Sequence, residues 1–433
     1  MATGCHARVV HFQGSGSSGS QTITDALGPG QTPKAALFVL SGATSLDTLT
    51  SNGRISIGMT DGTTQRSVGY ATEDGAVAGS ARSAARADVD TVIQMPAGNA
   101  GGALDIEASF SSFGNNSVTI SWSAGTTLRG FVVLFYGEVL QANVVSLAGS
   151  SSIGGTASTT APGFQPDAII GVRVNLAFSA DNSTSNGMIS FGVATRAGSI
   201  KHMCSAATVE NASGGNTSSG VVLRDDVILT TLSSSGGTIS SGARLAVSAF
   251  NADGFTVTTS NAAVSIEGAF LSLRLAGDTC WAGVETVTAG STGSKSITTP
   301  GFKGLLAIFT GPRSATVNTV GSGQGQFFVG ACDRNLTQGA AGLQAVDNQT
   351  STSATHSAMR SVDCVDVQQN STTYDWLANQ TAFTSSGLTL NVSDAGTGDR
   401  ILGVADLGVD RPDLNWLPEA TGHRRWRRQL ARM

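Results

Sequence analysis

The chain has little charge. Asp, Glu, Lys and Arg make up 13% of its 433 residues, about half of the roughly 25% that is usual in globular domains. The net charge is −5, and no cluster of basic residues occurs before residue 409. Folded domains that bind nucleic acid present clustered Lys and Arg. Nucleic acid is therefore not expected as a partner of the main body of the chain.

The sequence also lacks long apolar runs and paired cysteines. No stretch approaches the roughly 18 apolar residues of a membrane span, and the N-terminal sequence MATGCHARVVHFQGSG has no basic segment followed by an apolar core. We expect neither a membrane span nor a secretory signal. The five cysteines are scattered, which favours reduced thiols in a protein made in the cytoplasm over a disulfide framework. They are Cys5, Cys204, Cys280, Cys332 and Cys364.

Glycine is abundant, with 55 residues, and Ser, Thr and Ala are frequent beside it. Hydrophobic residues make up 40% of the chain and form runs such as GFVVLFYG (130–137), which separates it from Gly/Ser-rich disordered sequences. Runs of five to eight residues alternate with turns of Gly, Asn, Asp and Ser, and no long pattern with the helical period of 3.6 occurs. The sequence predicts an all-β protein.

Two phrases occur three times. The first joins a Gly/Ser turn, a Thr/Ser-rich strand, a short turn and an apolar strand: GSQTITDALGPGQTPKAALFVL (19–40), GTASTTAPGFQPDAIIGVRV (155–174) and GSKSITTPGFKGLLAIFTG (293–311). The second is GRISIG (53–58), GMISFG (187–192) and GQFFVG (325–330). Its last glycines, Gly58, Gly192 and Gly330, lie 134 and 138 residues apart. The order of the phrases is the same each time.

Two weaker landmarks follow in each copy. One is an Arg before an acid: Arg86/Asp88, Arg224/Asp226 and Arg360/Asp363. The other is a Phe four residues before a Gly: Phe110/Gly114, Phe250/Gly254 and Phe383/Gly387. Four landmarks in the same order indicate an internal triplication, and a period of about 130 residues is too long for a solenoid or propeller blade. We predict three tandem antiparallel β-sandwiches of roughly eight strands each, with a jelly roll preferred to an immunoglobulin-like topology.

The predicted domains are residues 1–137, 138–277 and 278–408, followed by a tail at 409–433. The connectors between the sandwiches, EVLQAN (138–143) and DTCWAG (278–283), are short. Short connectors predict a fixed relation between neighbouring domains rather than independent motion.

No arrangement typical of catalysis is found. GSGSSG (14–19) matches a dinucleotide-binding pattern, but a strand and not a helix follows it. The five histidines occupy no shared position in the copies, so a catalytic triad is not expected. Glu73-Asp74, with Glu210-Asn211 and Asp347-Asn348 in the other copies, reads as a surface turn or as a weak sugar or partner contact. We predict no catalytic residue and no cofactor, and therefore no enzyme.

The repeated Arg-led acids allow two interpretations. Asp residues near one another supply oxygens for calcium, whereas an adjacent Arg favours an Arg–carboxylate pair that braces the end of a strand. The recurring Arg makes the ion pair the preferred interpretation. His202-Met203-Cys204 has no second ligand pair at zinc spacing, so no metal site is predicted.

The tail after Gly408 differs in composition from the rest of the chain. It contains two prolines and a cluster of arginines. A solvated tail, a segment for nucleic acid or a membrane surface, and a peptide that docks on an acidic partner are all open. Docking is favoured because Trp and Arg are enriched at interface hot spots. The candidate docking residues are Trp416, Arg424, Arg425, Trp426, Arg427 and Arg428.

The repeated phrase, with G-F-x-P-[KD]-A before the apolar strand and G-x-I-S-[IF]-G after it, resembles repeats in structural proteins of tailed bacteriophages. The resemblance covers most of residues 9–408. The first copy departs from it with Thr-Pro in place of Gly-Phe, and the third has Lys303-Gly304 in place of the proline. No functional residue is carried over, since these motifs mark strands and turns.

The resemblance implies a non-enzymatic component of the virion surface, either a tail-associated fibre or host-attachment protein or a capsid decoration protein. Attachment at the tail is favoured. The implied partners are other virion proteins, further copies of this chain in a homo-oligomer, and a host-surface glycan or receptor. From the residues alone, a carbohydrate-binding or hydrolytic protein stays open, although Trp122, Tyr136 and Trp376 do not recur in equivalent positions.

Overall fold

A computed structural model describes residues 5–74, 83–98, 102–180, 182–185, 187–209, 219–235, 238–261, 265–275, 280–287, 291–313, 316–322, 324–346, 355–368, 374–396 and 400–408. These residues form 33 β-strands and no α-helix. The described strand pairs are antiparallel, and the predicted all-β class is confirmed. No helix long and apolar enough to cross a membrane is found in this part of the chain.

The strands fall into three consecutive groups, which we call units 1, 2 and 3. Unit 1 contains β1 (His6–Gln13), β2 (Gly19–Thr24), β3 (Ala35–Ser41), β4 (Leu49–Ser51), β5 (Gly53–Thr60), β6 (Gln65–Thr72), β7 (Ser83–Asp88), β8 (Ile93–Pro96), β9 (Leu104–Gly114), β10 (Ser117–Trp122) and β11 (Arg129–Tyr136). Unit 2 contains β12 (Gln141–Ala148), β13 (Thr156–Thr159), β14 (Ala168–Val174), β15 (Asn182–Ser185), β16 (Met188–Thr195), β17 (Lys201–Val209), β18 (Ser219–Arg224), β19 (Leu229–Ser235), β20 (Thr238–Asn251), β21 (Gly254–Ser260) and β22 (Glu267–Arg274). Unit 3 contains β23 (Cys280–Val287), β24 (Gly293–Ile297), β25 (Leu306–Gly311), β26 (Gly321–Ser322), β27 (Gln324–Asp333), β28 (Gln338–Val346), β29 (Thr355–Arg360), β30 (Val365–Gln368), β31 (Tyr374–Thr384), β32 (Gly387–Asp394) and β33 (Arg400–Leu407).

The sheets have corresponding strand orders in the three units. The four-stranded sheets are β2-β10-β9-β8, β13-β21-β20-β19 and β24-β32-β31-β30. The seven-stranded sheets are β1-β11-β3-β5-β6-β7-β15, β12-β22-β14-β16-β17-β18-β26 and β23-β33-β25-β27-β28-β29-β4. In each unit a hydrophobic core lies between the small sheet and one face of the large sheet. Each unit is therefore a two-layer sandwich, with more strands than the roughly eight expected from the sequence.

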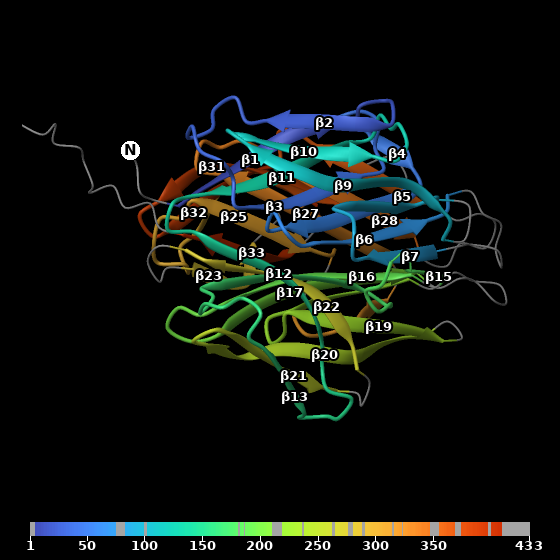
Figure 1. Cartoon of the computed structure of the whole chain (residues 1–433). Helices are drawn as coiled ribbons and strands as arrows, with labels where there is room; N and C mark the ends of the chain where they lie inside the picture. Colours follow the sequence, from blue (N-terminus) through green and yellow to red (C-terminus); the bar gives the residue numbers. More distant parts are fainter. Residues whose placement is uncertain are drawn as a thin grey trace, which may run out of the picture.

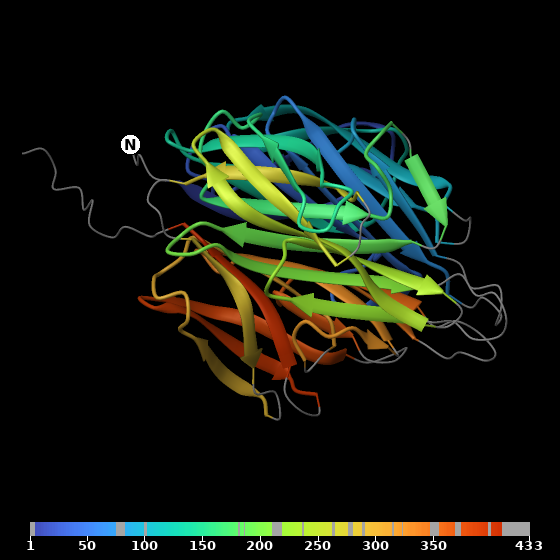
Figure 2. The same ribbon diagram turned by 90° about the horizontal axis from the view of Figure 1, so that it is seen from below.

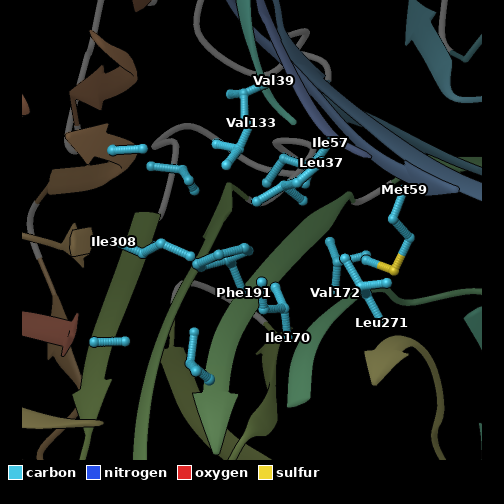
Figure 3. Close-up of a cluster of buried hydrophobic side chains, with 14 of the residues drawn as sticks. Leu37, Val39, Ile57, Met59, Val133, Ile170, Val172, Phe191, Leu271 and Ile308 are labelled. Atoms are coloured by element: carbon cyan, nitrogen blue, oxygen red, sulfur yellow. The ribbon is translucent and has the colours of Figure 1, made fainter. Parts of the chain in front are cut away.

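The other faces of the three large sheets meet in one central core. Every residue of β3 and β14 is buried, because both faces of these strands are covered. Figure 3 shows side chains from all three units pointing into this core: Leu37, Val39, Ile57, Met59 and Val133 of unit 1, Ile170, Val172, Phe191 and Leu271 of unit 2, and Ile308 of unit 3. The units are thus packed around a shared interior, which agrees with the fixed relation predicted from the short connectors.

The last strand of each large sheet comes from the next unit. β15 of unit 2 pairs with β7 of unit 1, β26 of unit 3 pairs with β18 of unit 2, and β4 of unit 1 pairs with β29 of unit 3. The three donations run in one direction and close a ring. Figures 1 and 2 show the blue, green-yellow and orange-red strand groups side by side around one centre.

Strand register defines which residues are equivalent in the units, and the repeated glycines occupy one position. A Cβ atom on Gly58, Gly192 or Gly330 would lie 2.0, 2.0 or 1.9 Å from a carbonyl oxygen of the segment that leads into β8, β19 or β30. The oxygens belong to Val92, Ile228 and Cys364. This close approach explains why the glycine recurs.

Register also corrects two sequence landmarks. Arg224 and Arg360 pair with Cys204 and Ala340, and the residue in that position of unit 1 is Asp88, which pairs with Ser67. Arg86 lies two residues earlier on the strand. In the hairpins, Phe250 and Phe383 pair with Phe255 and Leu388, and the residue placed likewise in unit 1 is Phe113, opposite Val118. Spacing in the sequence alone had identified Arg86 and Phe110 as the equivalent residues of unit 1.

At one pair of core positions the aromatic residue lies on a different strand in unit 2. Phe38 lies opposite Val132 in unit 1, and Phe309 lies opposite Val404 in unit 3. Unit 2 has Gly171 opposite Phe270 at these positions. A Cβ atom on Gly171 would lie 3.2 Å from the Phe270 ring. The Phe270 ring therefore lies against the position where units 1 and 3 have an aromatic side chain on the neighbouring strand, and a glycine at 171 leaves room for it.

Candidate functional site: the seams between units

Three seams join the units, and each contains a donated strand together with the first strand of the following unit. Seams 1–2 and 2–3 also have a peptide connection, so we call them the tethered seams. Seam 3–1 joins the last unit to the first without a covalent link, and we call it the closing seam. The seams are the candidate functional site because they hold the described units in one body.

A glycine–hydroxyl contact recurs across the seams. The backbone N–H of Gly187 donates to Ser83 Oγ at 3.0 Å, and Ser83 Oγ donates to the carbonyl of Val209 at 2.5 Å. At the closing seam, Gly53 N–H donates to Thr355 Oγ1 at 3.2 Å, and Thr355 Oγ1 donates to the carbonyl of Thr72 at 3.1 Å. The first glycine of the second repeated phrase is therefore a seam residue.

A turn residue with left-handed backbone precedes the donated strand at two seams. Asp47 has φ of 59° and Asn318 has φ of 62°, a conformation that Asp and Asn adopt more readily than most residues. Their backbone N–H groups donate to the carbonyls of Met359 and Leu223, each at 2.8 Å. We call Asp47 and Asn318 the hook residues.

The hook side chains differ in charge. Asp47 accepts hydrogen bonds from Ser361 N–H at 3.0 Å and from Ser361 Oγ at 2.8 Å, and it lies 3.5 Å from Arg360 Nε. Asn318 at the tethered seam donates to Asp225 Oδ1 at 2.6 Å and accepts from Arg224 through its backbone carbonyl at 3.3 Å. The closing seam therefore has a carboxylate where the tethered seam has an amide.

A second difference in charge appears at the first strands of the units. Asp61 accepts from Val144 N–H at 2.8 Å across seam 1–2, and the equivalent Asp333 accepts from Val9 N–H at 3.0 Å across the closing seam. At the closing seam Arg8 Nη1 also lies 3.2 Å from Asp333 Oδ2, whereas the residue equivalent to Arg8 in unit 2 is Asn143. Burial raises the pKa of Asp333, and the Val9 hydrogen bond and the Arg8 charge act in the opposite direction.

A third position distinguishes the seams. The ring nitrogen Nε2 of His11 donates to the carbonyl of Gln338 at 2.7 Å, next to Gly339, whose missing side chain leaves room for the ring. At seam 1–2 the equivalent contact is Arg66 Nε to Ser146 Oγ at 2.7 Å. Burial lowers the pKa of His11. The closing seam thus combines an ion pair, a charged hook and a neutral histidine.

The Arg–carboxylate interpretation of the third landmark is confirmed in units 2 and 3. Arg224 binds Asp226 through two hydrogen bonds of 2.8 and 2.6 Å, and Arg360 binds Asp363 at 3.0 and 2.5 Å. Each arginine also receives the hook of the next unit, a role that the sequence did not indicate. Arg86 of unit 1 donates to the carbonyl of Gly102 at 2.7 Å. No group of three potential metal ligands occurs in the described part of the chain.

The acidic turn of unit 1 lies at the closing seam. Asp74 accepts from the backbone N–H of Thr355 at 3.1 Å, and its own N–H donates to Asn52 Oδ1 at 2.8 Å. Its counterparts at 210–211 and 347–348 lie outside the described residues. Asp74 thus contacts unit 3 of the same chain.

The five cysteines are free and buried. Burial raises the pKa of Cys204 to about 12, so this thiol is protonated at neutral pH. The candidate docking residues of the tail, Trp416, Arg424, Arg425, Trp426, Arg427 and Arg428, lie outside the described residues.

Unit 3 contains a cluster of buried polar side chains in its sandwich. Gln326 donates to the carbonyl of Gln368, and Gln368 Nε2 donates to Asp366 Oδ2 at 3.5 Å. Gln344 lies opposite Gln326 on the neighbouring strand. Burial raises the pKa of Asp366 to about 7. Unit 1 has the neutral Gln94 at the position of Asp366, so this ionisable core position is a property of unit 3.

Comparison with known proteins gives no match to a family model, to a curated protein or to a solved structure. The function is therefore argued from the arrangement of the units and from their seams.

Proposed function

We propose that the chain arose by triplication of one jelly-roll-like sandwich. The corresponding strand orders of the three units support this origin. In each unit the first two strands pair with the last two in different sheets, as β1 pairs with β11 and β2 with β10, so that a ribbon wraps around the sandwich. The larger sheet departs from a jelly roll of eight strands, because it has six strands of its own unit and one of the next.

We further propose that the protein is a non-enzymatic structural component of a bacteriophage virion, placed at the tail and used in host attachment. The observation that carries this proposal is the closed ring: three sandwiches share one core and exchange strands in a cycle. Such a body resists deformation and presents three outward sheets from a single chain. These properties suit a particle component that transmits contact with a host surface.

The outward sheets add a second argument for attachment. Thr22 and Thr119 share a hydrogen bond of 3.0 Å on the outer face of unit 1, and the equivalent Ser158 and Thr256 share one of 2.8 Å in unit 2. Unit 3 pairs Ser296 with Thr389 at this position. A pair of hydroxyl-bearing residues that occurs at this position three times offers a multivalent contact, in which weak individual affinities combine. A host-surface glycan or receptor is the proposed partner.

Capsid decoration is the second candidate. The approximate threefold arrangement of the units favours it, because one chain fills the place that three symmetric subunits occupy on a threefold axis. Other virion proteins are the partners in either case.

Labelling intact particles distinguishes the candidates. We expect an antibody against residues 5–408 to bind at the tail in electron micrographs. Binding over the whole shell supports decoration, and particles that contain none of the protein contradict both. The docking hypothesis for the tail predicts that deletion of residues 410–433 prevents incorporation into particles while the ring still folds; normal incorporation excludes it.

A further inference from the structure

The buried polar cluster of unit 3 lies between the two sheets of its sandwich. Gln326 and Gln344 lie opposite each other on β27 and β28 of the large sheet, and Asp366 and Gln368 lie on β30 of the small sheet. A Cβ atom on Gly342, two residues from Gln344, would lie 2.7 Å from Asp366 Oδ2 and 2.9 Å from Gln368 Nε2. Because alternate residues of a strand share a face, the side chains of β30 reach the large sheet beside Gln344.

Three of these side chains are almost completely buried and have polar atoms without partners. Gln344 is 0%, Gln368 is 1% and Asp366 is 2% exposed. Among the described residues, none forms a hydrogen bond with either amide atom of Gln344, with Gln368 Oε1 or with Asp366 Oδ1. Buried polar groups of native proteins are nearly always paired, because an unpaired one destabilises the fold. These atoms therefore indicate a site for a bound polar group.

Register shows that the site is a property of unit 3. The positions of Asp366 and Gln344 have uncharged residues in the other units, namely Gln94 and Ala71 in unit 1 and Thr230 and Thr208 in unit 2. The shared sandwich architecture therefore does not require a carboxyl group here. The acid and the amides have been added to one unit.

The charges around Asp366 leave a negative surplus. Its carboxyl group lies within electrostatic range of Arg360, Asp363 and Asp47. Arg360 binds Asp363 through hydrogen bonds of 3.0 and 2.5 Å and lies 3.5 Å from Asp47 Oδ1. Three ionised carboxylates and one guanidinium give a formal charge of −2. A cation beside Asp366 reduces this surplus, whereas an anion increases it.

We propose that the cluster binds a calcium ion through Asp366 and the side-chain oxygens of Gln344 and Gln368. Calcium takes about six to eight oxygen ligands in flexible geometry, and amide carbonyls and waters serve beside carboxylates. Magnesium is less suited, because it demands a near-ideal octahedron and retains its own waters. The proposal does not depend on where the protein lies on a particle.

The ligand set has one carboxylate and otherwise neutral oxygens. It differs from the clusters of His, Cys, Asp and Glu that hold many metals, and no such cluster occurs in the described ranges of the chain. Calcium affinity depends on the number of charged ligands, and sites of low charge bind weakly. We expect a dissociation constant of about 10⁻⁴–10⁻³ M.

Calorimetric titration of the full chain with calcium, after treatment with a chelator, tests the site. Wild type is expected to bind one calcium ion, and the midpoint of thermal unfolding is expected to rise with calcium, because a ligand of the folded state stabilises it. Asp366→Asn keeps the shape of the side chain and removes its charge, and is expected to weaken binding at least about tenfold. The matched control Asp226→Asn removes a 46% exposed carboxylate that pairs with Arg224 in unit 2, and is expected to bind calcium as wild type does.

Gln344→Leu separates ion binding from folding. The change removes the unpaired amide and retains a side chain of similar size. We expect the variant to be at least as stable as wild type in chelator and to bind calcium more weakly. A loss of stability in chelator with unchanged calcium affinity shows that the amide has a structural role only, and contradicts the proposal. This variant decides the question if Asp366→Asn does not fold.

Three other results contradict the calcium site. They are the absence of saturable binding up to about 10 mM calcium, equal affinities of wild type and Asp366→Asn, and an equal loss of affinity in Asp226→Asn. Sodium chloride at matched ionic strength controls for screening, and an equal rise of the midpoint with sodium is a further contradiction. In crystals grown with calcium, anomalous density between Asp366 and Gln344 supports the proposal, and water alone at that place overturns it.

Discussion

The closing seam and the tethered seams share the same strand pairing but differ in their side chains. Asp47 takes the place of Asn318, and Arg8 takes the place of Asn143. At these two positions the charged residue lies at the seam without a covalent connection, although Arg66 and Arg224 bring charges to the tethered seams. Hydrogen bonds to charged groups are stronger than neutral ones, so we interpret these substitutions as compensation for the absent tether. The comparison indicates that specific side-chain contacts matter most at the one seam that no peptide connection holds together.

The largest effect is expected from removal of Asp333. Asp333→Ala leaves the buried guanidinium of Arg8 with Asp25 as its remaining carboxylate partner. The expected cost is about 2–4 kcal/mol, below that of a buried charge left without any partner. The matched change Asp61→Ala at seam 1–2 removes the hydrogen bond from Val144 N–H without unpairing a buried guanidinium, and is expected to cost about 1–3 kcal/mol. Denaturant unfolding measures both.

Two controls accompany this comparison. Asp333 and Asp61 both accept backbone hydrogen bonds within their own turns, so turn disruption affects the two variants alike. Arg8→Asn combined with Asp333→Ala closes a double-mutant cycle: because Asp333 acts through Arg8, the combined cost is expected to be smaller than the sum of the two single costs. Equal costs for Asp333→Ala and Asp61→Ala contradict the role of charge at the closing seam.

Exchange of the hook residues has the next largest effect. Asp47→Asn replaces the charged hook with that of seam 2–3 and is expected to cost about 1–2 kcal/mol, since Asp47 is partly exposed and screened. The cost decreases as salt is added. Asn318→Asp places a carboxylate beside Asp225, and the repulsion is expected to destabilise by about 1 kcal/mol. A stabilising Asn318→Asp, measured by denaturant unfolding at low salt, contradicts this account.

A smaller effect, equal at two seams, is expected for the shared hydroxyl contact. Thr355→Val and Ser83→Ala each remove the hydroxyl that accepts from Gly53 or Gly187, and each is expected to cost about 1 kcal/mol. Thermal unfolding of the two variants provides the measurement. A clear difference between the stability losses of the two variants indicates that the glycine–hydroxyl contact does not play the same role at the two seams.

The smallest effect concerns His11 and its dependence on pH. Burial lowers the pKa of His11 below 6.5, so the unfolded chain takes up a proton that the folded seam excludes. The contribution of His11 to stability is present above pH 6.5 and is lost as the pH falls through the lowered pKa. His11→Ser introduces the residue of the equivalent position, Ser146. We expect the difference in unfolding free energy between wild type and His11→Ser to decrease toward acid pH; a difference that is constant with pH contradicts it.

The sequence predicted the strand content, because alternation and turns are local signals. The landmarks that led to the hypothesis of three copies fall in three units with corresponding strand orders. The sequence did not predict the ring. Pairing between Thr50 and Ser357 joins residues far apart in the chain. A short polar donated strand also has no residue composition that marks it as a strand. The chosen landmarks were also misplaced where segment lengths differ, as with Arg86 and Phe110.

A signal for the seams was present but ambiguous. Gly53, Gly187 and Gly325 recur as the first residue of a phrase, and Ser83, Ser219 and Thr355 recur as hydroxyl residues. Only the structure shows that these two sets lie near each other across unit boundaries. Core pairs such as Gly171 and Phe270 further hide equivalence, because both positions differ from their counterparts in the other units.

A circular permutant tests the central claim of a closed ring most directly. Register makes Leu407 and His6 equivalent to Phe135 and Gln141, so a linker as long as Tyr136–Leu140 is sufficient to join Leu407 to His6. The permutant opens the chain between Glu138 and Val139 and omits residues 409–433. We expect it to fold and to lose no more than a few kcal/mol of unfolding free energy, because the newly untethered seam has the neutral contacts of Asn143. A permutant that remains unfolded while the unpermuted chain without residues 409–433 folds contradicts the ring.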